Sequence, residues 1–208
     1  GQGGLTHVSE LSLANMQLSE VPAGFMYPFR NVRALNVDNN ALTTLPQALS
    51  RLLHLQELML SRNNLHLDAS HFEVLAGMSR LSVLDLSENP LGSFGLALDR
   101  LPRLRQLGLR GAGLTEVPSH LEHAVSLEYV DLRDNHITEL PASLNAQRAQ
   151  WRQRIALAGN PLPDIYRDLW IDASRTSDSE ASSDGDAFHL SRWMEHLDAE
   201  ARALRTAQ

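Results

Sequence analysis

Apolar residues recur along the chain in one pattern, which is clearest from Leu127 to Pro141. This stretch reads LEYVDLRDNHITELP and has the spacing L-x-x-L-x-L-x-x-N-x-L-x-x-L-P. Val130 and Leu132 are separated by one residue, which is typical of a strand with one buried face. Asn135 stands where a turn is expected, and its amide can bond backbone groups that the turn leaves unpaired. The pattern therefore predicts a short strand followed by an inward turn.

This pattern occurs seven times, and the last copy is incomplete. The central strand position of the copies is held by Leu11, Leu35, Leu58, Leu84, Leu107, Val130 and Ile155, at steps of 23 to 26 residues. The asparagine position is held by Met16, Asn40, Asn63, Asn89, Ala112, Asn135 and Asn160. A repeat of this length and spacing is the signature of a leucine-rich repeat. We therefore expect an α/β solenoid, an arc of about seven repeats with a parallel concave sheet, followed by a C-terminal amphipathic helix.

An apolar residue also follows most of the turns and is expected on the outer arc, in a short helical or 3₁₀ turn. These residues are Phe25, Leu49, Leu98, Leu121 and Leu144. The third repeat has a longer connection, in which Phe72, Leu75 and Met78 are spaced as on a helix. We interpret this connection as a surface insertion that contains a longer convex helix.

The repeats form one domain with an expected cap. Residues 1–7 are interpreted as an N-terminal linker or a remnant of a longer sequence, and residues 8–171 as the repeat domain. A solenoid needs a cover for its last coil, because each coil buries its apolar edge only against its neighbours. Ile165, Leu169 and Trp170 follow the last copy and are expected to supply that cover.

The chain after the cap changes character twice. Residues 172–187 are rich in Ser, Asp and Gly and are predicted to be an acidic, flexible linker. Residues 188–208 are predicted to form an amphipathic helix. Its apolar positions are Phe188, Trp193, Leu197, Ala201 and Leu204. Three destinations are open for this helix, namely the solenoid's own end, a following domain or another subunit, and we favour the following domain.

Composition narrows the class of protein. The hydrophobic content of 43% supports a substantial core, and the aromatic content of 5% suits a core of stacked leucines. No run of about 18 apolar residues is present, so no membrane span is expected. The net charge of −7 argues against a nucleic-acid-binding surface. Residues 172–187 carry five acids and one arginine, which leaves the arc itself nearly neutral.

Candidate chemistry is sparse. The absence of cysteine excludes disulfide-bonded repeat caps, a thiolate zinc site and a cysteine nucleophile within these residues. The histidine pairs His120 and His123, and His66 and His71, lack a third ligand at a recognisable spacing. No phosphate-binding glycine loop and no hydrolase or metalloprotease motif is present. We therefore expect no catalytic residue, no metal and no cofactor.

What remains is the concave surface, where the residues between the buried strand positions form three columns. The first column is Glu10, Ala34, Glu57, Val83, Gln106, Tyr129 and Arg154, and the second is Ser12, Asn36, Met59, Asp85, Gly108, Asp131 and Ala156. The third is Ala14, Asp38, Ser61, Ser87, Arg110, Arg133 and Ala158. Tyr and Arg are favoured at the centres of protein interfaces. The predicted partner is a protein, and the predicted contact residues are Met59, Val83, Asp85, Arg110, Tyr129, Asp131 and Arg133.

Two stretches carry a family resemblance. The irregular last copy, RIALAGNPLP from Arg154 to Pro163, and the run from Phe188 that ends SRWMEHLDAEARALRTAQ resemble bacterial effectors of the novel E3 ligase (NEL) class. The resemblance implies that the repeat domain selects a host substrate, and that a following helical domain, which the repeats could contact, transfers ubiquitin through a cysteine. It also implies a bacterial cytoplasmic protein that is secreted into a host cell.

Two features depart from that class, since these repeats are longer than its usual ones and the chain has no cysteine. The alternative is a free-standing cytoplasmic repeat scaffold that acts in signalling and resembles intracellular Ras-group repeat proteins.

Overall fold

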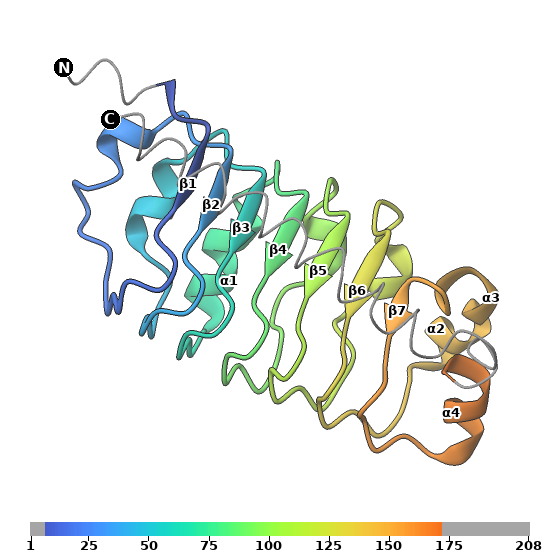
Figure 1. Cartoon of the computed structure of the whole chain (residues 1–208). Helices are drawn as coiled ribbons and strands as arrows, with labels where there is room; N and C mark the ends of the chain where they lie inside the picture. Colours follow the sequence, from blue (N-terminus) through green and yellow to red (C-terminus); the bar gives the residue numbers. More distant parts are fainter. Residues whose placement is uncertain (1–6, 172–208) are drawn as a thin grey trace.

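The computed structural model describes residues 7–171, which form a curved solenoid with one parallel sheet along its inner side (Figure 1). The sheet has seven strands in the order of the sequence. They are β1 (Glu10–Ser12), β2 (Ala34–Asn36), β3 (Glu57–Met59), β4 (Val83–Asp85), β5 (Gln106–Gly108), β6 (Tyr129–Asp131) and β7 (Ile155–Ala156). The expected fold class, an α/β solenoid with a parallel concave sheet, is confirmed.

The strand register agrees with the register of the sequence pattern. The central positions of the seven copies pair in one continuous row from Leu11 to Ile155. Since the side-chain period of a strand is two, this row directs its side chains to one side of the sheet and its neighbours to the other. A slip of one residue in any repeat would exchange these two sides.

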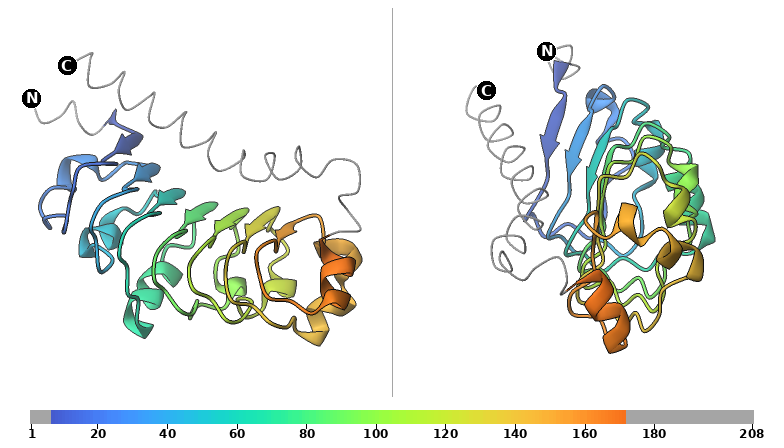
Figure 2. Two further views of the ribbon diagram at one scale, coloured as in Figure 1. Left: turned by 60° about the horizontal axis from the view of Figure 1, so that its bottom comes forward. Right: turned by 90° about the vertical axis from the view of Figure 1, so that its right-hand side faces the viewer.

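The convex side carries one short helix or 3₁₀ turn in most repeats (Figure 2). These elements are η2 (Tyr27–Phe29), η3 (Gln47–Arg51), α1 (Ala69–Ala76), η4 (Leu98–Arg100), η5 (Leu121–His123), α2 (Ala142–Ala146), α3 (Arg148–Trp151) and α4 (Asp164–Trp170). The longer third connection contains α1, which begins after the N-cap Asp68 and buries Phe72 and Leu75. One outer-arc expectation is wrong, because Phe25 is exposed and Met26 takes the buried place instead.

The main hydrophobic core runs through the repeats between the sheet and the convex turns. Leu58, Leu84, Leu107 and Val130 have no exposed surface. Each of these side chains is stacked on the equivalent residue one repeat away, so the core is built from contacts between neighbouring coils.

Asparagine side chains hold the turns of neighbouring repeats together. The Asn135 amide donates to the carbonyls of Leu109 and Leu132, at 2.9 Å each, and its oxygen accepts from the backbone of Ala112 and Leu114 at 3.0 Å. The same position donates to carbonyls of its own and the preceding repeat in every copy that has the asparagine. Where Ala112 replaces it, the backbone of Gly92 donates directly to the Ala112 carbonyl at 3.0 Å.

The residue before this asparagine position adopts a left-handed backbone conformation in every repeat. These residues are Asn15, Asn39, Arg62, Glu88, Gly111, Asp134 and Gly159. A glycine at position 159 is favoured for a second reason, because a Cβ added there would collide with the side-chain oxygen of Asp134 and lie only 3.1 Å from its backbone nitrogen.

The C-terminal cover of the solenoid is α4. Trp170 is buried, and its indole nitrogen donates to the Asn145 side chain at 3.0 Å. Leu169 is partly buried against the core, whereas Ile165 is exposed, contrary to the expectation that it would pack inward. In a helix of this length Tyr166 and Trp170 share a face, and Ile165 lies outside that face.

The predicted acidic linker at 172–187, the amphipathic helix at 188–208 and the N-terminal segment up to residue 6 lie outside the described residues. Over residues 7–171, no helix is both long and apolar enough to cross a membrane.

Candidate functional site

The concave face consists of the three columns of residues on the inner side of the sheet. The strand pairing places in these columns the residues that the repeat pattern predicted for them. Strand pairing places Val83 beside Glu57 and Gln106 in the first column, and Asp85 beside Met59 and Gly108 in the second. Ala34, Met59, Val83 and Tyr129 form a second apolar cluster, separate from the main core, with Ala156 packed against it. The structure thus brings together the three apolar residues among the predicted contacts.

Most of the predicted contact residues are more buried than expected for an open surface. Arg110 is the exposed one, with 45% of its side chain accessible. The buried ones are Met59, Val83, Asp85, Tyr129, Asp131 and Arg133.

The polar residues of the second column have a structural role that the sequence analysis missed. Each lies at the end of a strand and accepts a hydrogen bond from the backbone nitrogen two residues further on. The Asn36 side chain accepts from Asp38 at 2.8 Å, Asp85 from Ser87 at 3.0 Å, and Asp131 from Arg133 at 3.1 Å. A short polar side chain at the end of each strand is the signal that would have identified this role.

Three repeats lack an acceptor in the second column, because the residue there is Met59, Gly108 or Ala156. For the repeats of Met59 and Gly108, the preceding repeat supplies an acceptor from its third column. The Asp38 carboxylate accepts from the backbone of Ser61 at 2.7 Å, and the Ser87 hydroxyl accepts from the backbone of Arg110 at 3.2 Å. In these two repeats the backbone N–H group after the strand is therefore hydrogen-bonded by a side chain of the preceding repeat.

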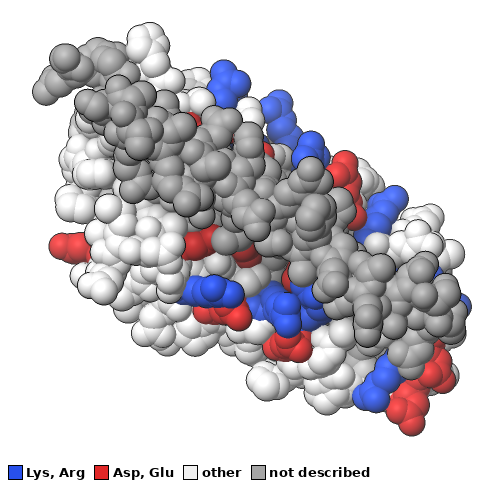
Figure 3. All heavy atoms as spheres, viewed as in Figure 1, with Lys and Arg blue, Asp and Glu red and all other residues white. Residues whose placement is uncertain are grey.

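The basic residues of the third column are paired in two different ways. Arg133 is buried and holds Asp131 through two hydrogen bonds, of 2.9 and 2.8 Å. Arg110 reaches Asp134 of the next repeat at 2.8 Å, and Arg62 pairs with Glu88 in the same way at 2.5 Å. Basic and acidic side chains accordingly lie next to each other on the surface (Figure 3). Arg110 is the predicted contact residue whose charge is most accessible to a partner.

Glu57 is the concave carboxyl with the most altered acidity. Its pKa is raised from 4.5 to about 7, mainly by burial and also by the negative charge of Glu10, while the positive charge of Arg105 acts in the opposite direction. Burial also raises the pKa of Asp85. Both carboxyls are therefore easier to protonate in the folded chain than in water.

The raised pKa of Glu57 predicts a pH-dependent stability. The folded state binds the proton more tightly than the unfolded state, so this contribution is complete below about pH 4.5 and is lost as the pH rises through about 7. Glu57→Gln cannot ionise and should remove it. We expect the difference in Tm between pH 5 and pH 8 to be smaller in the variant than in the wild type. An equal difference in both proteins would show that Glu57 titrates normally.

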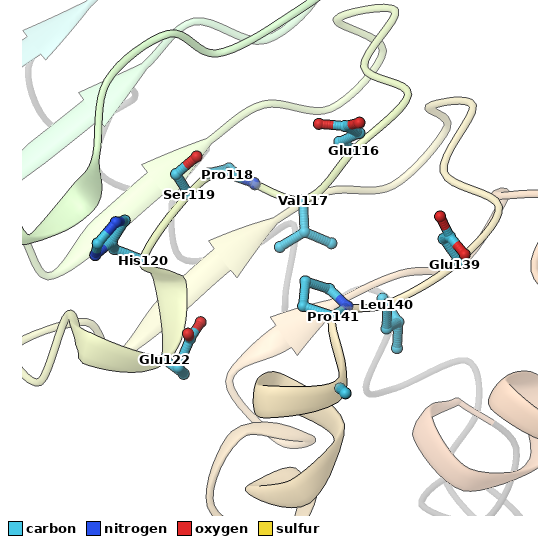
Figure 4. A pocket seen from close by; sticks show the side chains of 10 residues that line it. Glu116, Val117, Pro118, Ser119, His120, Glu122, Glu139, Leu140 and Pro141 are labelled. Carbon is cyan, nitrogen blue, oxygen red and sulfur yellow. The ribbon is translucent and has the colours of Figure 1, made fainter.

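A pocket of about 640 Å³ lies on the outer side, between the turns that follow β5 and β6 (Figure 4). It is lined by Glu116, Val117 and Pro118 of one repeat, by Glu139, Leu140, Pro141 and Ala142 of the next, and by Ser119, His120 and Glu122. A smaller pocket of about 220 Å³ occupies the equivalent place between the first two repeats, at Val21 and at Leu45 and Pro46. Since equivalent turns produce a pocket twice, it is a consequence of repeat stacking and not a dedicated ligand site.

The histidine pairs lie on convex turns. The rings of His120 and His123 are 5.7 Å apart, and each lies near a carboxylate, His120 at 3.7 Å from Asp99 and His123 at 3.5 Å from Glu122. His71 accepts from the backbone of Asp68 and so completes the cap of α1. Between residues 7 and 171, no three His, Asp or Glu side chains are placed to hold a metal ion.

Comparison with known proteins gives matches to two family models. Residues 6–65 and residues 126–146 match models described as leucine rich repeat. Osteomodulin of Rattus norvegicus is 27% identical over 92% of this chain, and leucine-rich repeat serine/threonine-protein kinase 1 of Mus musculus is 31% identical over 68% of it. The chain spans only 45% of the first of these relatives and 9% of the second.

Solved structures agree with the fold. An internalin (inlF) from Listeria monocytogenes superposes with a TM-score of 0.56 at 21% identity, over 76% of this chain and 42% of the internalin. At that identity the likeness concerns the fold alone.

Proposed function

Because the described residues form a leucine-rich repeat solenoid, we propose that the chain is a recognition module that binds a protein partner through its concave face. The observation that carries this proposal is the register of the seven strands. It aligns the variable residues of every repeat on one continuous surface, while the leucines of every repeat are directed into the core.

The chemistry of the concave face supports a protein partner. An apolar centre of Met59, Val83 and Tyr129, whose side chains have little exposed surface, is bordered by the exposed Arg110 and the buried Asp85. An apolar centre with a polar border is the usual anatomy of a protein interface, and Tyr and Arg are the residues that most often dominate its energy. The partner-binding role of Arg133 is supported less well, since this side chain is already committed to Asp131.

A finer proposal concerns the protein to which this module belongs. The resemblance of Arg154–Pro163 and of the run from Phe188 supports the substrate-binding region of a secreted bacterial E3 ubiquitin ligase effector. The partner would then be a host substrate, met after secretion into the host cell. With no cysteine in these 208 residues, the ubiquitin thioester of such a ligase would form in a different domain.

The alternative is a free-standing cytoplasmic scaffold. One similar protein, plant intracellular Ras-group-related LRR protein 8 of Oryza sativa, is 30% identical over 52% of this chain. The sequence encoded after Gln208 separates the two proposals. A helical domain with a Cys-x-Asp motif supports the ligase, and a stop codon or a further repeat array supports the scaffold.

The binding proposal is tested by reversing one accessible concave charge. Arg110→Glu breaks the exposed pair with Asp134, which should change stability by less than about 1 kcal/mol. It also places a negative charge at the border of the apolar centre, so we expect partner affinity to fall at least about tenfold, or about 1.4 kcal/mol. Pull-down from a candidate lysate, followed by titration of the recovered protein, measures this.

Arg100→Glu is the matched control. Arg100 lies on the convex side in η4, pairs with Glu73 at 2.6 Å and has 48% of its side chain exposed, close to the 45% of Arg110. Equal recovery of the partner by both variants would place the binding site away from the concave face.

A further inference from the structure

The loops that lead into β2 to β6 share one local structure. In each loop a tight turn is closed by a hydrogen bond of 2.9 to 3.1 Å from the backbone nitrogen of a buried residue to the carbonyl three residues earlier. The buried donors are Val32, Leu55, Leu81, Leu104 and Leu127. Since this residue anchors the loop in the core, the residues around it are left at the surface. The entry edge is the set of five four-residue stretches 30–33, 53–56, 79–82, 102–105 and 125–128.

The entry edge is a regular row along one margin of the solenoid. The last residue of each stretch donates its backbone N–H to the carbonyl of the equivalent residue one coil earlier, for example Arg105 to Ser82 and Glu128 to Arg105, at 2.8 Å each. These bonds extend the ladder of the sheet, so equivalent residues are separated by about 4.8 Å per coil. The side chains of the entry edge therefore line the margin where the chain enters the strands, beside the concave face and not on it.

The charge of the entry edge is almost entirely positive. It contains one acid, Glu128, and five exposed arginines, which are Arg30, Arg33, Arg80, Arg103 and Arg105. Within residues 7–171 none of these five arginines forms an ion pair. On the opposite margin, after the strands, Arg62 and Arg110 are each paired with a carboxylate of the next coil. A chain with a net charge of −7 thus carries a row of unpaired positive charge along one edge.

The space-filling view shows the same difference between the two margins. In Figure 3 basic groups follow the upper margin of the molecule, where the loops enter the strands in Figure 1. Along the lower margin, basic and acidic groups touch each other (Figure 3).

Two of the entry turns have an apolar residue at the tip. Leu53 and Val125 are the most exposed large apolar side chains of residues 7–171, with 73% and 86% of their surface accessible. They hold equivalent positions three coils apart, or about 14 Å along the row. Arg80, Arg103 and Arg105 lie in the coils between them. The most exposed apolar side chains and the unpaired arginines therefore belong to the same edge.

This combination matches an anionic lipid surface. Each arginine close to such a surface strengthens binding about fivefold, and the attraction fades over a Debye length of about 8 Å. Apolar side chains between the arginines gain further stabilisation when they enter the boundary between headgroups and acyl chains. The lateral edge of an arc can meet a flat surface along its length, whereas its concave face cannot.

Other polyanions fit the entry edge less well. Its five stretches contain no Phe, Tyr or Trp on which the bases of a single-stranded nucleic acid could stack. An acidic peptide would pair with the arginines but would leave Leu53 and Val125 in water.

We propose that the entry edge docks the chain on an anionic phospholipid surface, with its five arginines against the headgroups and with Leu53 and Val125 in the boundary below them. This activity goes beyond the proposed recognition of a protein partner and does not depend on it. The concave face stays accessible in this orientation, so a partner can bind to a chain that is held at a membrane.

Co-sedimentation of the full chain with vesicles tests the proposal. The vesicles consist of phosphatidylcholine alone, or of phosphatidylcholine with about 30% phosphatidylserine, and we expect the partition coefficient to be at least about tenfold higher on the second kind. Arg80→Glu combined with Arg103→Glu should lower it on anionic vesicles at least about tenfold. Leu53→Ser combined with Val125→Ser leaves every charge in place and should lower it severalfold.

Matched controls are available on other surfaces. Arg62→Glu combined with Arg100→Glu changes the net charge by the same amount away from the entry edge, at side chains that are 67% and 48% exposed. Ile165→Ser removes an apolar side chain that is 66% exposed from α4. Both controls should bind anionic vesicles within about twofold of the wild type. All these positions are exposed, so the Tm of each variant should stay within a few degrees of the wild type.

Three results would overturn the proposal. The first is equal binding of the wild type to both kinds of vesicle, and the second is an equal loss in the two arginine pairs, which would indicate a general effect of net charge. The third is full binding by the serine pair, which would favour an acidic peptide as the occupant, with polyaspartate as its probe. Partner binding at the concave face is measured without vesicles, by the Arg110→Glu experiment, so the two proposals succeed or fail separately.

Discussion

Leu132→Asp is expected to destabilise the solenoid by at least about 5 kcal/mol and to unfold its C-terminal coils. Leu132 has no exposed surface and lies in the core row that follows each central strand position. The substitution removes a buried leucine side chain, which alone costs about 2–5 kcal/mol, and adds a carboxylate that has no partner there. Hydrogen exchange should show lost protection that is centred on β5, β6 and β7.

Thr138→Asp is the control for this experiment. Thr138 lies in the same repeat and is exposed, so it receives the same charge in water and should change stability by less than about 0.5 kcal/mol. Similar losses from the two substitutions would mean that the assignment of core and surface positions in this repeat is wrong.

Asn135→Ala is expected to cost about 3 kcal/mol without changing a single apolar contact of the leucine row. The amide is buried and serves two backbone nitrogens and three carbonyls of two repeats. Its removal leaves buried polar groups unpaired, each at a cost of about 1–3 kcal/mol before the turn relaxes. For a domain of this size the Tm should fall by about 6–12 °C.

Asn64→Ala removes the same amide from an exposed position and should leave the Tm within about 2 °C of the wild type. Repeat five already tolerates Ala112 at the asparagine position, where a backbone hydrogen bond from Gly92 is made instead. If Asn135→Ala proved as harmless as Asn64→Ala, then backbone bonds of that kind, and not the asparagine ladder, would hold the turns.

Several concave residues are candidates for partner binding and also stabilise the fold, so few of them can be substituted without loss of stability. Asp85 and Asp131 look like binding residues by their position, yet each also accepts a backbone hydrogen bond at the end of its strand. Asp131→Ala would in addition leave the buried Arg133 without its bidentate partner. A loss of binding in such a variant would therefore not separate recognition from folding, which is why Arg110 is the better position for that test.

The sequence by itself determined the ladder of strands. Leu35, Leu58, Leu84 and Leu107 recur at a step that matches one coil, and burial of one face imposes a single register, so their pairing followed from the pattern alone. The membership of the concave columns followed for the same reason. The convex helix after Asp68 was also visible, because its apolar spacing is local.

Only the tertiary structure decided which concave side chains are used by the fold itself. The bond from the Ser61 backbone to Asp38 joins residues 23 positions apart, and it exists because Met59 offers no acceptor of its own. The outward position of Ile165 and the replacement of Phe25 by Met26 in the core depend likewise on how the end coils pack. The periodicity of the sequence predicts which residues every repeat buries. It does not predict the hydrogen bonds by which one repeat compensates for a missing acceptor in its neighbour, because those bonds depend on contacts between coils and not on the residue spacing within one coil.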